Sequence, residues 1–383
     1  MKRRLLINAS TCVVGGGVQV AVGFLHHLYG RLRDLNWEVA VLASPDVYDQ
    51  CAGLPEKEGW TTARISPSPA SLFGGLASRR AIREVTAGFR PEACFTVFGP
   101  SYLRLGIPEF SGFADPSVIC PNRHYLRNHS LMGKMRTRLT AWIKARALSR
   151  VERFWVETET ARRGLAARLG ISEDRIEVIP NVVNALFVPL PGDPAPGRMR
   201  FLHLSAHYPH KNHAFLLPVA EALRRLHPDL DFEFVVTLPE DGRPWAELMR
   251  SFRARGLGDR VRTLGRLGVR ECAAAYRDCH VVFHPSLLEV FSATYLEAFA
   301  AGRPVVATDL GFAREACGDA ALFFDPASAD DAAQSLHLAA TAPLIRRRLL
   351  EAGARRRDGA MTAAEKNERL IRAVNEFMSA RTP

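Results

Sequence analysis

The stretch VVFHPSLLEVFSATYLEAFAAGRPVVATD, residues 281–309, decides the fold. Its residue pattern predicts an apolar strand, a polar loop, a helix and a second strand over Pro304–Thr308. The free N–H groups at the start of such a helix, together with the helix dipole, favour an anion beside the loop. Two carboxylates, Glu289 and Glu297, flank this anion site, and carboxylates accept hydrogen bonds from hydroxyl groups. An anion next to hydroxyl groups indicates a sugar nucleotide as the ligand.

Strands and helices alternate on both sides of this stretch. The N-terminal half predicts a helix over Val18–Leu32 and strands over Arg4–Ala9, Glu38–Ala43, Ala93–Phe98, Ser117–Cys120, Arg153–Glu157 and Ile176–Ile179. After the Pro- and Gly-rich residues 188–198, a helix is predicted over Ala214–Leu226, with strands over Arg200–Leu204, Asp231–Thr237, Arg260–Leu264 and His280–His284. The two alternating units predict an α/β fold of two doubly wound parallel sheets that face each other across a cleft.

The same pattern sets the expected domain limits. We expect an N-terminal domain over residues 1–187, a linker over 188–198 and a second domain over 199–362. A C-terminal helix over about 363–383 is expected to pack back on the first domain. The 383 residues suffice for two such cores, and 47% hydrophobic with 24% charged residues is a globular composition.

Cysteine usage and the N-terminus indicate the compartment. The seven cysteines are scattered and contain no CxxC pair, which argues against a disulfide framework and against a zinc site. The basic start MKRRLLINAS lacks the long apolar run of a signal peptide, since the run breaks at Asn8. No apolar stretch approaches the ~20 residues that span a bilayer. We therefore expect a cytoplasmic protein, peripheral at the inner face of the membrane if it contacts one.

The net charge of +11 is concentrated in residues 123–153. Within this segment apolar residues recur at helical spacing between basic ones: Leu131, Met135, Leu139, Trp142, Ile143 and Ala147. Such a basic amphipathic helix suits an anionic membrane surface or a phosphorylated partner, and a core-facing helix with a solvated basic face is the alternative. A nucleic-acid-binding protein would also be basic, but no recognition helix or aromatic–basic interleaving is present, so no nucleic acid partner is expected.

The segment HPSLLEVFSATYLEAFAAGRPVVATD resembles the donor-binding signature of retaining GT-B glycosyltransferases of family 4, whose usual form is PSxxEGFGLPxLEAMAxGxPVVAS. An N-terminal glycine loop, NWEVAVLAS, RIEVIPNVVNALFVP and GDAALFFDPASADDAA agree with the family in order and spacing, so the resemblance covers about residues 4–340. It implies a retaining, metal-independent transfer of a sugar from a nucleoside-diphosphate sugar to an acceptor bound by the N-terminal domain. No cofactor is implied.

The resemblance also implies roles for single residues. Lys211 takes the place of the family's phosphate-binding lysine, Glu289 that of a ligand of the donor sugar, and Glu297 that of a ligand of the ribose hydroxyls. A fixed cation near the leaving phosphate stabilises the charge that grows there in the transition state. Further residues of the donor site are expected to be Ser292, Ala293, Thr294, His210 and Arg266. Each of the three main residues has an ordinary alternative: an exposed loop lysine, a solvated loop acid, and a helix capping box formed by Thr294 and Glu297.

The chain departs from the family at several of these positions. Ala206 stands where the family has an arginine five residues before the lysine, and His207 or His210 is the candidate replacement for its charge. Val290 and Ser292 replace two glycines of the loop.

On the acceptor side, Gly15, Gly16 and Gly17 form the loop expected to meet the diphosphate and the acceptor. His124 lies near the position of the family's cleft histidine, where it would orient the donor or accept a hydrogen bond from the acceptor; a loop histidine beside the basic helix is the alternative. Asn181 is expected to line the cleft.

One wider reading is dismissed and another stays open. Asp229 and Asp231 match the DxD pattern of metal-dependent glycosyltransferases, but they lie at a helix-to-strand turn and no metal is expected. A sugar-nucleotide epimerase of the same fold would share the nucleotide site.

The basic N-terminal half favours a lipid-linked or anionic glycan acceptor. The Arg-rich composition is typical of GC-rich bacteria, and together these two features favour a role in cell-envelope polysaccharide assembly. The sequence specifies neither the sugar nor the base.

Overall fold

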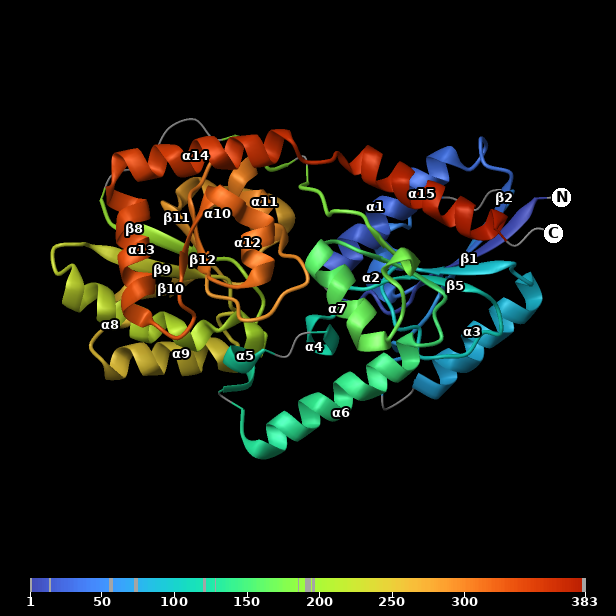
Figure 1. Ribbon diagram of the computed structural model, residues 1–383, viewed down its shortest axis with the longest axis horizontal. Coiled ribbons are helices and arrows are strands. Elements are labelled where there is room, and N and C mark those ends of the chain that lie inside the picture. Colours follow the sequence, from blue (N-terminus) through green and yellow to red (C-terminus); the bar gives the residue numbers. More distant parts are fainter. Residues whose placement is uncertain are drawn as a thin grey trace. The chain divides into compact units, whose positions relative to one another are not determined.

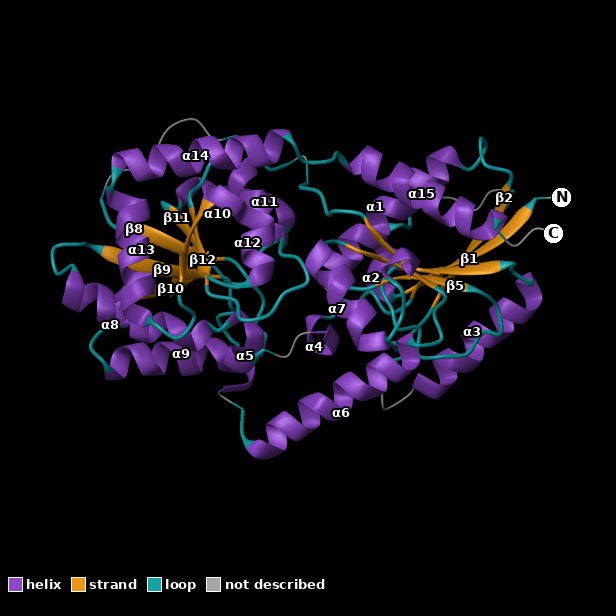
Figure 2. Ribbon diagram, in the orientation of Figure 1, coloured by secondary structure: helices purple, strands orange, loops and turns teal. Residues whose placement is uncertain are grey.

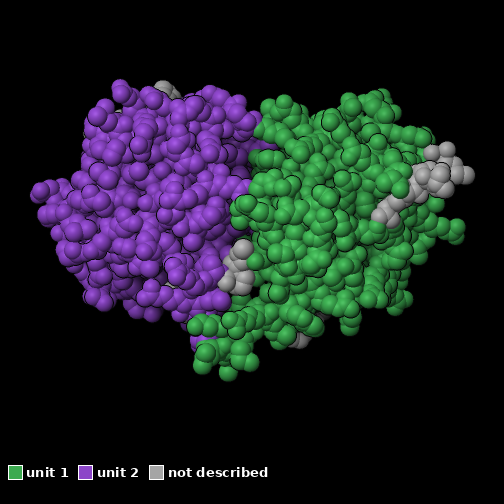
Figure 3. Space-filling view, viewed as in Figure 1, with its two compact units in different colours: residues 1–120, 131–181, 361–383 green, residues 121–130, 182–360 purple. Residues whose placement is uncertain are grey.

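The chain folds into two compact units (Figure 3). The computed structural model describes all residues except 1, 14, 55–57, 72–74, 120–121, 128, 185, 190–193, 195–196 and 381–383. Unit 1 comprises residues 1–120, 131–181 and 361–383, and unit 2 comprises residues 121–130 and 182–360. Figure 1 follows the chain through both units.

Unit 1 is built on a seven-stranded parallel sheet in the order β3-β2-β1-β4-β5-β6-β7. Its strands are β1 (Arg3–Ala9), β2 (Trp37–Ala43), β3 (Trp60–Arg64), β4 (Ala93–Thr96), β5 (Glu109–Gly112), β6 (Arg153–Val156) and β7 (Ile176–Val178). Its helices are α1 (Gly16–Arg31), α2 (Pro45–Gln50), α3 (Gly75–Phe89), α4 (Pro116–Ile119), α6 (Leu131–Leu148), α7 (Glu159–Leu169) and α15 (Ala363–Ser379). Residues 5–9 of β1 are all buried, because helices cover both faces of the sheet (Figure 2).

Unit 2 repeats this plan with a six-stranded parallel sheet in the order β10-β9-β8-β11-β12-β13. The strands are β8 (Met199–His203), β9 (Phe232–Val236), β10 (Val261–Thr263), β11 (Val281–His284), β12 (Val305–Thr308) and β13 (Ala321–Phe324). The helices are α5 (Arg123–Arg127), α8 (Leu216–Leu226), α9 (Arg243–Ala254), α10 (Val269–Asp278), α11 (Ala293–Ala300), α12 (Gly311–Cys317), α13 (Ala329–Thr341) and α14 (Pro343–Asp358). The strand–loop–helix–strand reading of residues 281–309 corresponds to β11, α11 and β12.

The C-terminal helix α15 belongs to unit 1, where its apolar side chains join the core beside α1. A capping box between Thr362 and Glu365 starts it. Lys366, almost fully buried, donates from Nζ to Oδ1 of Asn181 at 2.8 Å. Burial lowers the pKa of Lys366, and the nearby Glu157 acts in the opposite direction. The side chain of Asn181, which was expected to line a cleft, therefore accepts a hydrogen bond from helix α15 of unit 1.

Some elements differ from the sequence-based expectations. The strand predicted over residues 117–120 is wrong: residues 116–119 form α4, whose start is fixed because Asp115 accepts hydrogen bonds from the backbone N–H and the hydroxyl of Ser117. Residues 121–130 belong to unit 2, and the unit boundary falls after Asn181 and not after residue 187. One cause is Asn122, whose Nδ2 donates to the carbonyl of Leu287 at 2.5 Å. In the described ranges, no helix combines the length and apolarity needed to cross a bilayer.

Candidate functional site

The candidate site lies at the carboxyl ends of β8 and β11, which are neighbours in the sheet of unit 2. The loops that follow these strands are joined by backbone and side-chain hydrogen bonds. Leu287 N donates to the carbonyl of His210 at 2.8 Å, and Ser286 Oγ lies 3.2 Å from the same oxygen. Asn212 Nδ2 donates to the carbonyl of Pro285 at 3.3 Å. These bonds fix the turn carrying Lys211 against the loop carrying Glu289.

Lys211 and Glu289 form a largely buried ion pair, with Nζ 2.5 Å from Oε1. The single hydroxyl proton of Ser286 goes to this carboxylate oxygen, 2.6 Å from Oγ, which is shorter than the 3.2 Å contact with the carbonyl of His210. His284 Nε2 lies 3.5 Å from the same carboxylate oxygen. The two side chains are only 15% and 8% exposed, so the readings of Lys211 as an exposed loop lysine and of Glu289 as a solvated loop acid are wrong. Burial would raise the pKa of Glu289, but Lys211 and then His284 outweigh it, so the pKa lies well below its usual range.

Glu297 projects from α11 and is held by a neighbouring helix. Its Oε2 accepts a hydrogen bond of 2.8 Å from the hydroxyl of Tyr276 on α10. Burial raises the pKa of Glu297, and the hydrogen bond from Tyr276 opposes that rise. Ser292, and not Thr294, is the residue before the first turn of α11, and no side chain caps this end. The capping-box reading of Glu297 is therefore wrong.

The N-terminus of α11 opens into the same loop. Ser292 is the N-cap residue, and Ala293 and Thr294 are the first two helical residues. Their N–H groups have no acceptor within the helix, so this end favours an anion without needing the two glycines that the loop lacks. A cation, a helix N-terminus and two carboxylates thus lie on one edge of one sheet.

A buried hydrogen-bond chain of histidines lies beneath Lys211. His203 donates from Nδ1 to the carbonyl of Phe283 at 3.2 Å, so its Nε2 is left to accept from Ser205 Oγ at 3.1 Å. Ser205 Oγ in turn accepts from His213 Nε2 at 3.3 Å. Burial lowers the pKa of His213 to about 3, and lowers the pKa of His203 as well, assisted by the neighbouring histidines and Lys211. Both imidazoles are thus neutral at physiological pH.

This chain makes unit 2 sensitive to acid, and we expect a measurable pH dependence. Between pH 6.5 and about pH 3 the unfolded chain binds a proton at His213 that the folded chain does not. The free energy of unfolding should therefore fall as the pH is lowered through this window, by up to about 1.4 kcal/mol per pH unit from this residue. Urea unfolding at a series of pH values measures it. His213→Gln keeps a donor for Ser205 and should flatten the profile; parallel profiles for the two proteins would contradict the assignment.

Two family models match consecutive parts of the chain. The model described as "Glycosyl transferase 4-like domain" matches residues 16–182, and "Glycosyl transferases group 1" matches residues 198–341. The second match contains Lys211, Glu289 and Glu297. The chain thus consists of a glycosyl transferase 4-like domain followed by a group 1 glycosyl transferase domain.

Curated relatives of the glycosyltransferase chain match it in part. The chain is 32% identical over 191 residues to the MMP alpha-(1->4)-mannosyltransferase of Mycolicibacterium hassiacum, which is 49% of this chain and 44% of the relative. It is 30% identical over 167 residues to the D-inositol 3-phosphate glycosyltransferase of Pseudarthrobacter chlorophenolicus, which is 42% of this chain and 40% of the relative. The matches thus span under half of the length of these relatives.

Solved structures of the same fold match the chain end to end. A glycosyltransferase from Rickettsia africae superposes with a TM-score of 0.72 at 16% identity, covering 100% of both chains. The Anabaena protein HepE, solved in complex with UDP and glucose, gives a TM-score of 0.72 at 14% identity over 98% of this chain and 100% of that one. The two parallel sheets and these superpositions show that the chain has the GT-B fold.

Of the other expected residues in unit 2, His210 directly precedes Lys211, whereas Arg266 and His124 lie in other segments. In unit 2, Arg266 is an exposed residue after β10, two strands away from β8, and His210 stacks on Tyr208 with ring centroids 5.5 Å apart. His124 lies in α5, where its Nε2 accepts a hydrogen bond from Arg123. Asn122, one residue before α5, ties this segment to the Glu289 loop.

The glycine loop lies in unit 1, at the carboxyl end of β1. Gly15 has a φ of +63°, which an L-residue rarely adopts, and Gly16 and Gly17 begin α1. These glycines therefore lie at the edge of the sheet of unit 1 that corresponds to the candidate site in unit 2.

The DxD pattern has another explanation in the glycosyltransferase fold. Asp231 forms ion pairs with Arg198 at 3.2 Å and with Arg260 at 2.5 Å. These two ion pairs account for its carboxylate without a metal ion. Across the described stretches of the chain, no three His, Cys, Asp or Glu side chains lie together as a metal site.

The sequence reading missed Tyr276 and His284. Tyr276 lies 21 residues before Glu297 and touches it only through helix packing, so nothing local marks it. His284 is the last residue of β11, and a strand-end histidine carries no signal until its distance to Glu289 is known.

Proposed function

We propose that the chain is a retaining, metal-independent glycosyltransferase that moves a sugar from a nucleoside-diphosphate sugar to an acceptor bound by unit 1. The observation that carries this proposal is the largely buried Lys211–Glu289 pair beside the N-terminus of α11, which no side chain caps. A diphosphate needs a cation and N–H donors, and both are present there. Glu297, held by Tyr276, supplies an acceptor for two neighbouring ribose hydroxyls.

The relatives support a sugar nucleotide as donor. The similar Anabaena protein was solved with UDP and glucose, and the partial relatives are named as a mannosyltransferase and an inositol phosphate glycosyltransferase. We therefore propose that the donor is a hexose linked to a nucleoside diphosphate.

The reaction proposed for this site breaks the bond between the sugar C1 and the phosphate oxygen, while the acceptor oxygen bonds to C1 on the same face. Negative charge grows on the leaving phosphate, and Lys211 and the N–H groups of α11 stabilise it more in the transition state than in the ground state. The departing phosphate takes the proton of the acceptor hydroxyl. Glu289 holds hydroxyl groups of the donor sugar, and Lys211 and His284 keep its carboxylate ionised.

We propose the acceptor class from the charge of the chain. A net charge of +11 favours an anionic or lipid-linked glycan, and we propose that the reaction belongs to cell-envelope polysaccharide assembly at the cytoplasmic face of a membrane.

The donor is tested by a thermal-shift screen of UDP-, GDP- and ADP-sugars. The preferred donor at about 100 times its Kd should stabilise the protein by about 2.7 kcal/mol. The reaction is then tested with the preferred donor and a lipid-linked acceptor in EDTA. We expect a released nucleoside diphosphate and, by NMR, a glycoside with the anomeric configuration of the donor. A donor sugar epimerised without acceptor indicates the epimerase; no shift with any nucleotide contradicts the donor site.

A further inference from the structure

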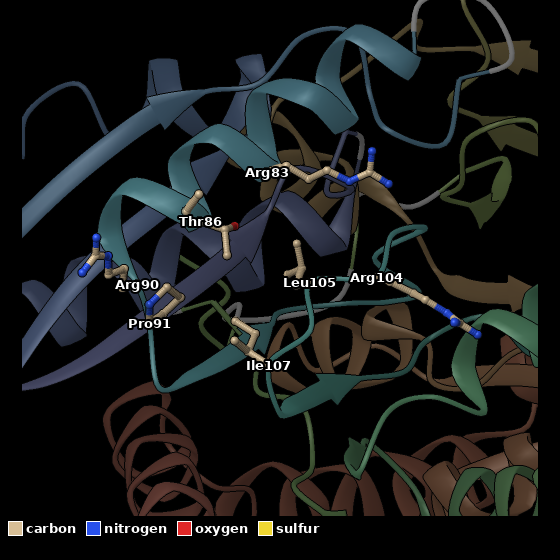
Figure 4. Close-up of a pocket in the computed structure, with 8 residues that line it drawn as sticks. Arg83, Thr86, Arg90, Pro91, Arg104, Leu105 and Ile107 are labelled. Carbon is tan, nitrogen blue, oxygen red and sulfur yellow. The ribbon is translucent and has the colours of Figure 1, made fainter.

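One face of unit 1 carries arginines that surround two hollows. The larger hollow, of about 510 Å³, lies between α3 and the segment 101–107 (Figure 4). Its apolar floor consists of Pro91, Leu105 and Ile107, and Arg83, Arg90 and Arg104 stand around its edge (Figure 4). The smaller hollow, of about 280 Å³, adjoins the same segment, and α6 forms its other wall. Its arginines are Arg79, Arg146 and Arg150, and its apolar residues are Leu103, Trp142 and Ile143. We call this surface the arginine face.

The arginine face is separate from the proposed reaction site. Arg90 and Pro91 precede β4, and Ile107 precedes β5, so the larger hollow lies at the amino edge of the sheet of unit 1. The loop of Gly15 follows β1, at the carboxyl edge of the same sheet. Since all strands of this sheet are parallel, the two positions lie at opposite edges. A ligand of the arginine face is therefore not the sugar donor.

The charge of this face is uncompensated. Among the described residues, no carboxylate lies within ion-pair distance of Arg83, Arg90, Arg104 or Arg150. Nearby acids serve other groups: Glu84 pairs with Arg80, and Asp115 pairs with Lys144. Arg104 and Arg146 lie close enough to Arg150 to lower its pKa, after partial desolvation as the larger cause. Like charges gathered in this way favour a polyanionic surface.

Helix α6 adds an apolar strip to the arginine face. Its six large apolar side chains are between 50% and 81% exposed: Leu131, Met132, Met135, Leu139, Trp142 and Ile143. At 100° per residue these six fall within an arc of about 120°. The buried residues of α6, Ala141 and Leu148, lie on the opposite side of the helix. The reading of α6 as a core-facing helix with a solvated basic face is therefore wrong: it turns its large apolar side chains to the solvent.

The positive charge of the arginine face indicates which kind of partner binds it. A second copy of the chain would bring the same uncompensated arginines against it, and their repulsion disfavours such a symmetric contact. A bilayer with anionic phospholipids offers phosphates for arginine forks and an acyl layer for apolar side chains. An exposed apolar strip bordered by basic residues, here Arg136 and Arg138, is the pattern of helices that lie in a membrane interface.

We propose that the arginine face docks on an anionic phospholipid bilayer. The six arginines of the two hollows hold lipid phosphates, and the apolar strip of α6 enters the boundary between headgroups and acyl chains. The sequence located the basic surface in residues 123–153; the structure assigns residues 121–130 to unit 2 and adds α3 and the segment 101–107 to the surface. This inference does not depend on the proposed donor chemistry.

The test is flotation of the full chain with two kinds of vesicle: phosphatidylcholine alone, and phosphatidylcholine with about a third of phosphatidylglycerol. We expect binding to the anionic vesicles only, weakening as salt is added. The variant Arg104→Ala/Arg150→Ala should lower the partition coefficient about fivefold per arginine removed. The matched control Arg253→Ala/Arg348→Ala removes the same charge from exposed helices of unit 2 and should bind like the wild type.

The apolar strip is tested separately. Trp142→Ala should weaken binding to anionic vesicles while thermal unfolding stays unchanged, because the side chain is 59% exposed. Equal binding to both kinds of vesicle, or equal loss in the control variant, would overturn the proposal. So would tighter binding of single-stranded RNA than of vesicles, stabilisation by soluble glycerol phosphate without vesicle binding, or a dimer that Trp142→Ala dissociates.

Discussion

Replacing Lys211 with alanine is expected to lower kcat by about 10²–10³-fold at saturating donor, because the site loses its fixed cation at the leaving phosphate. The change also removes the partner of Glu289, whose carboxylate is buried and 2.5 Å from Nζ in the wild type. Breaking a buried pair from one side costs about 3–5 kcal/mol of folding free energy. Steady-state kinetics and urea unfolding of the same preparation measure the two effects.

A double variant separates catalysis from stability. Lys211→Met combined with Glu289→Gln removes both charges, so no unpaired ion stays buried, and the amide still accepts from Ser286 Oγ. We expect this variant to regain most of the stability that Lys211→Ala loses, while kcat stays as low. Lys211→Arg retains the charge and should lose less activity than Lys211→Ala. If Lys211→Ala folds normally and turns over within threefold of the wild type, the phosphate role of Lys211 is wrong.

The secondary structure was predicted best where short apolar runs are separated by clearly polar loop residues. Residues 281–309 alternate between buried strands and polar loops, and β11, α11 and β12 follow that pattern closely. The pattern failed where strands are polar. Strand β5 reads EFSG, and its Glu109 is partly buried, with Thr96 and Ser101 donating to its carboxylate. Such a strand has no apolar periodicity, because hydrogen bonds from Thr96 of β4 and from Ser101 make its glutamate compatible with partial burial.

The candidate site shows the same division. Lys211, Glu289 and the α11 loop could be placed together from the sequence because each follows a strand, and the carboxyl ends of parallel strands share one edge. The residues that contact this site from other elements could not be located from the sequence. Tyr276 reaches Glu297 from another helix, and His203, Ser205 and His213 meet beneath Lys211 through tertiary packing. The replacement of the family's arginine by Ala206 was visible in the sequence, but the neutral histidine chain beside it was not.

Replacing Glu297 with alanine is expected to weaken nucleotide binding about 100-fold and to reduce the nucleotide-dependent stabilisation from about 2.7 to about 0.4 kcal/mol at the same ligand concentration. A carboxylate that accepts from two ribose hydroxyls contributes about 1.5 kcal/mol per charge-assisted hydrogen bond, and the loss of both corresponds to about two decades in Kd. Titration calorimetry with the preferred nucleoside diphosphate, which lacks the sugar, measures this loss without any contribution from Glu289. An undiminished shift in the Glu297→Ala protein means that the ribose binds elsewhere.

Tyr276→Phe tests whether Glu297 must be held to act. The phenol donates to Oε2 of Glu297 at 2.8 Å and thereby opposes the rise in pKa that burial causes. Without it the pKa of Glu297 rises further, and a protonated carboxyl no longer accepts from two hydroxyls, so nucleotide affinity should fall at a higher pH than in the wild type. Tyr295→Phe is the matched control, because the hydroxyl of this buried tyrosine has no hydrogen-bond partner among the described residues. Only Tyr276→Phe changes the charge state of the Glu297 carboxylate. We therefore expect the pH profile of Kd to shift in Tyr276→Phe and to stay unchanged in Tyr295→Phe. Equal shifts in both variants would indicate a general effect of losing a buried hydroxyl.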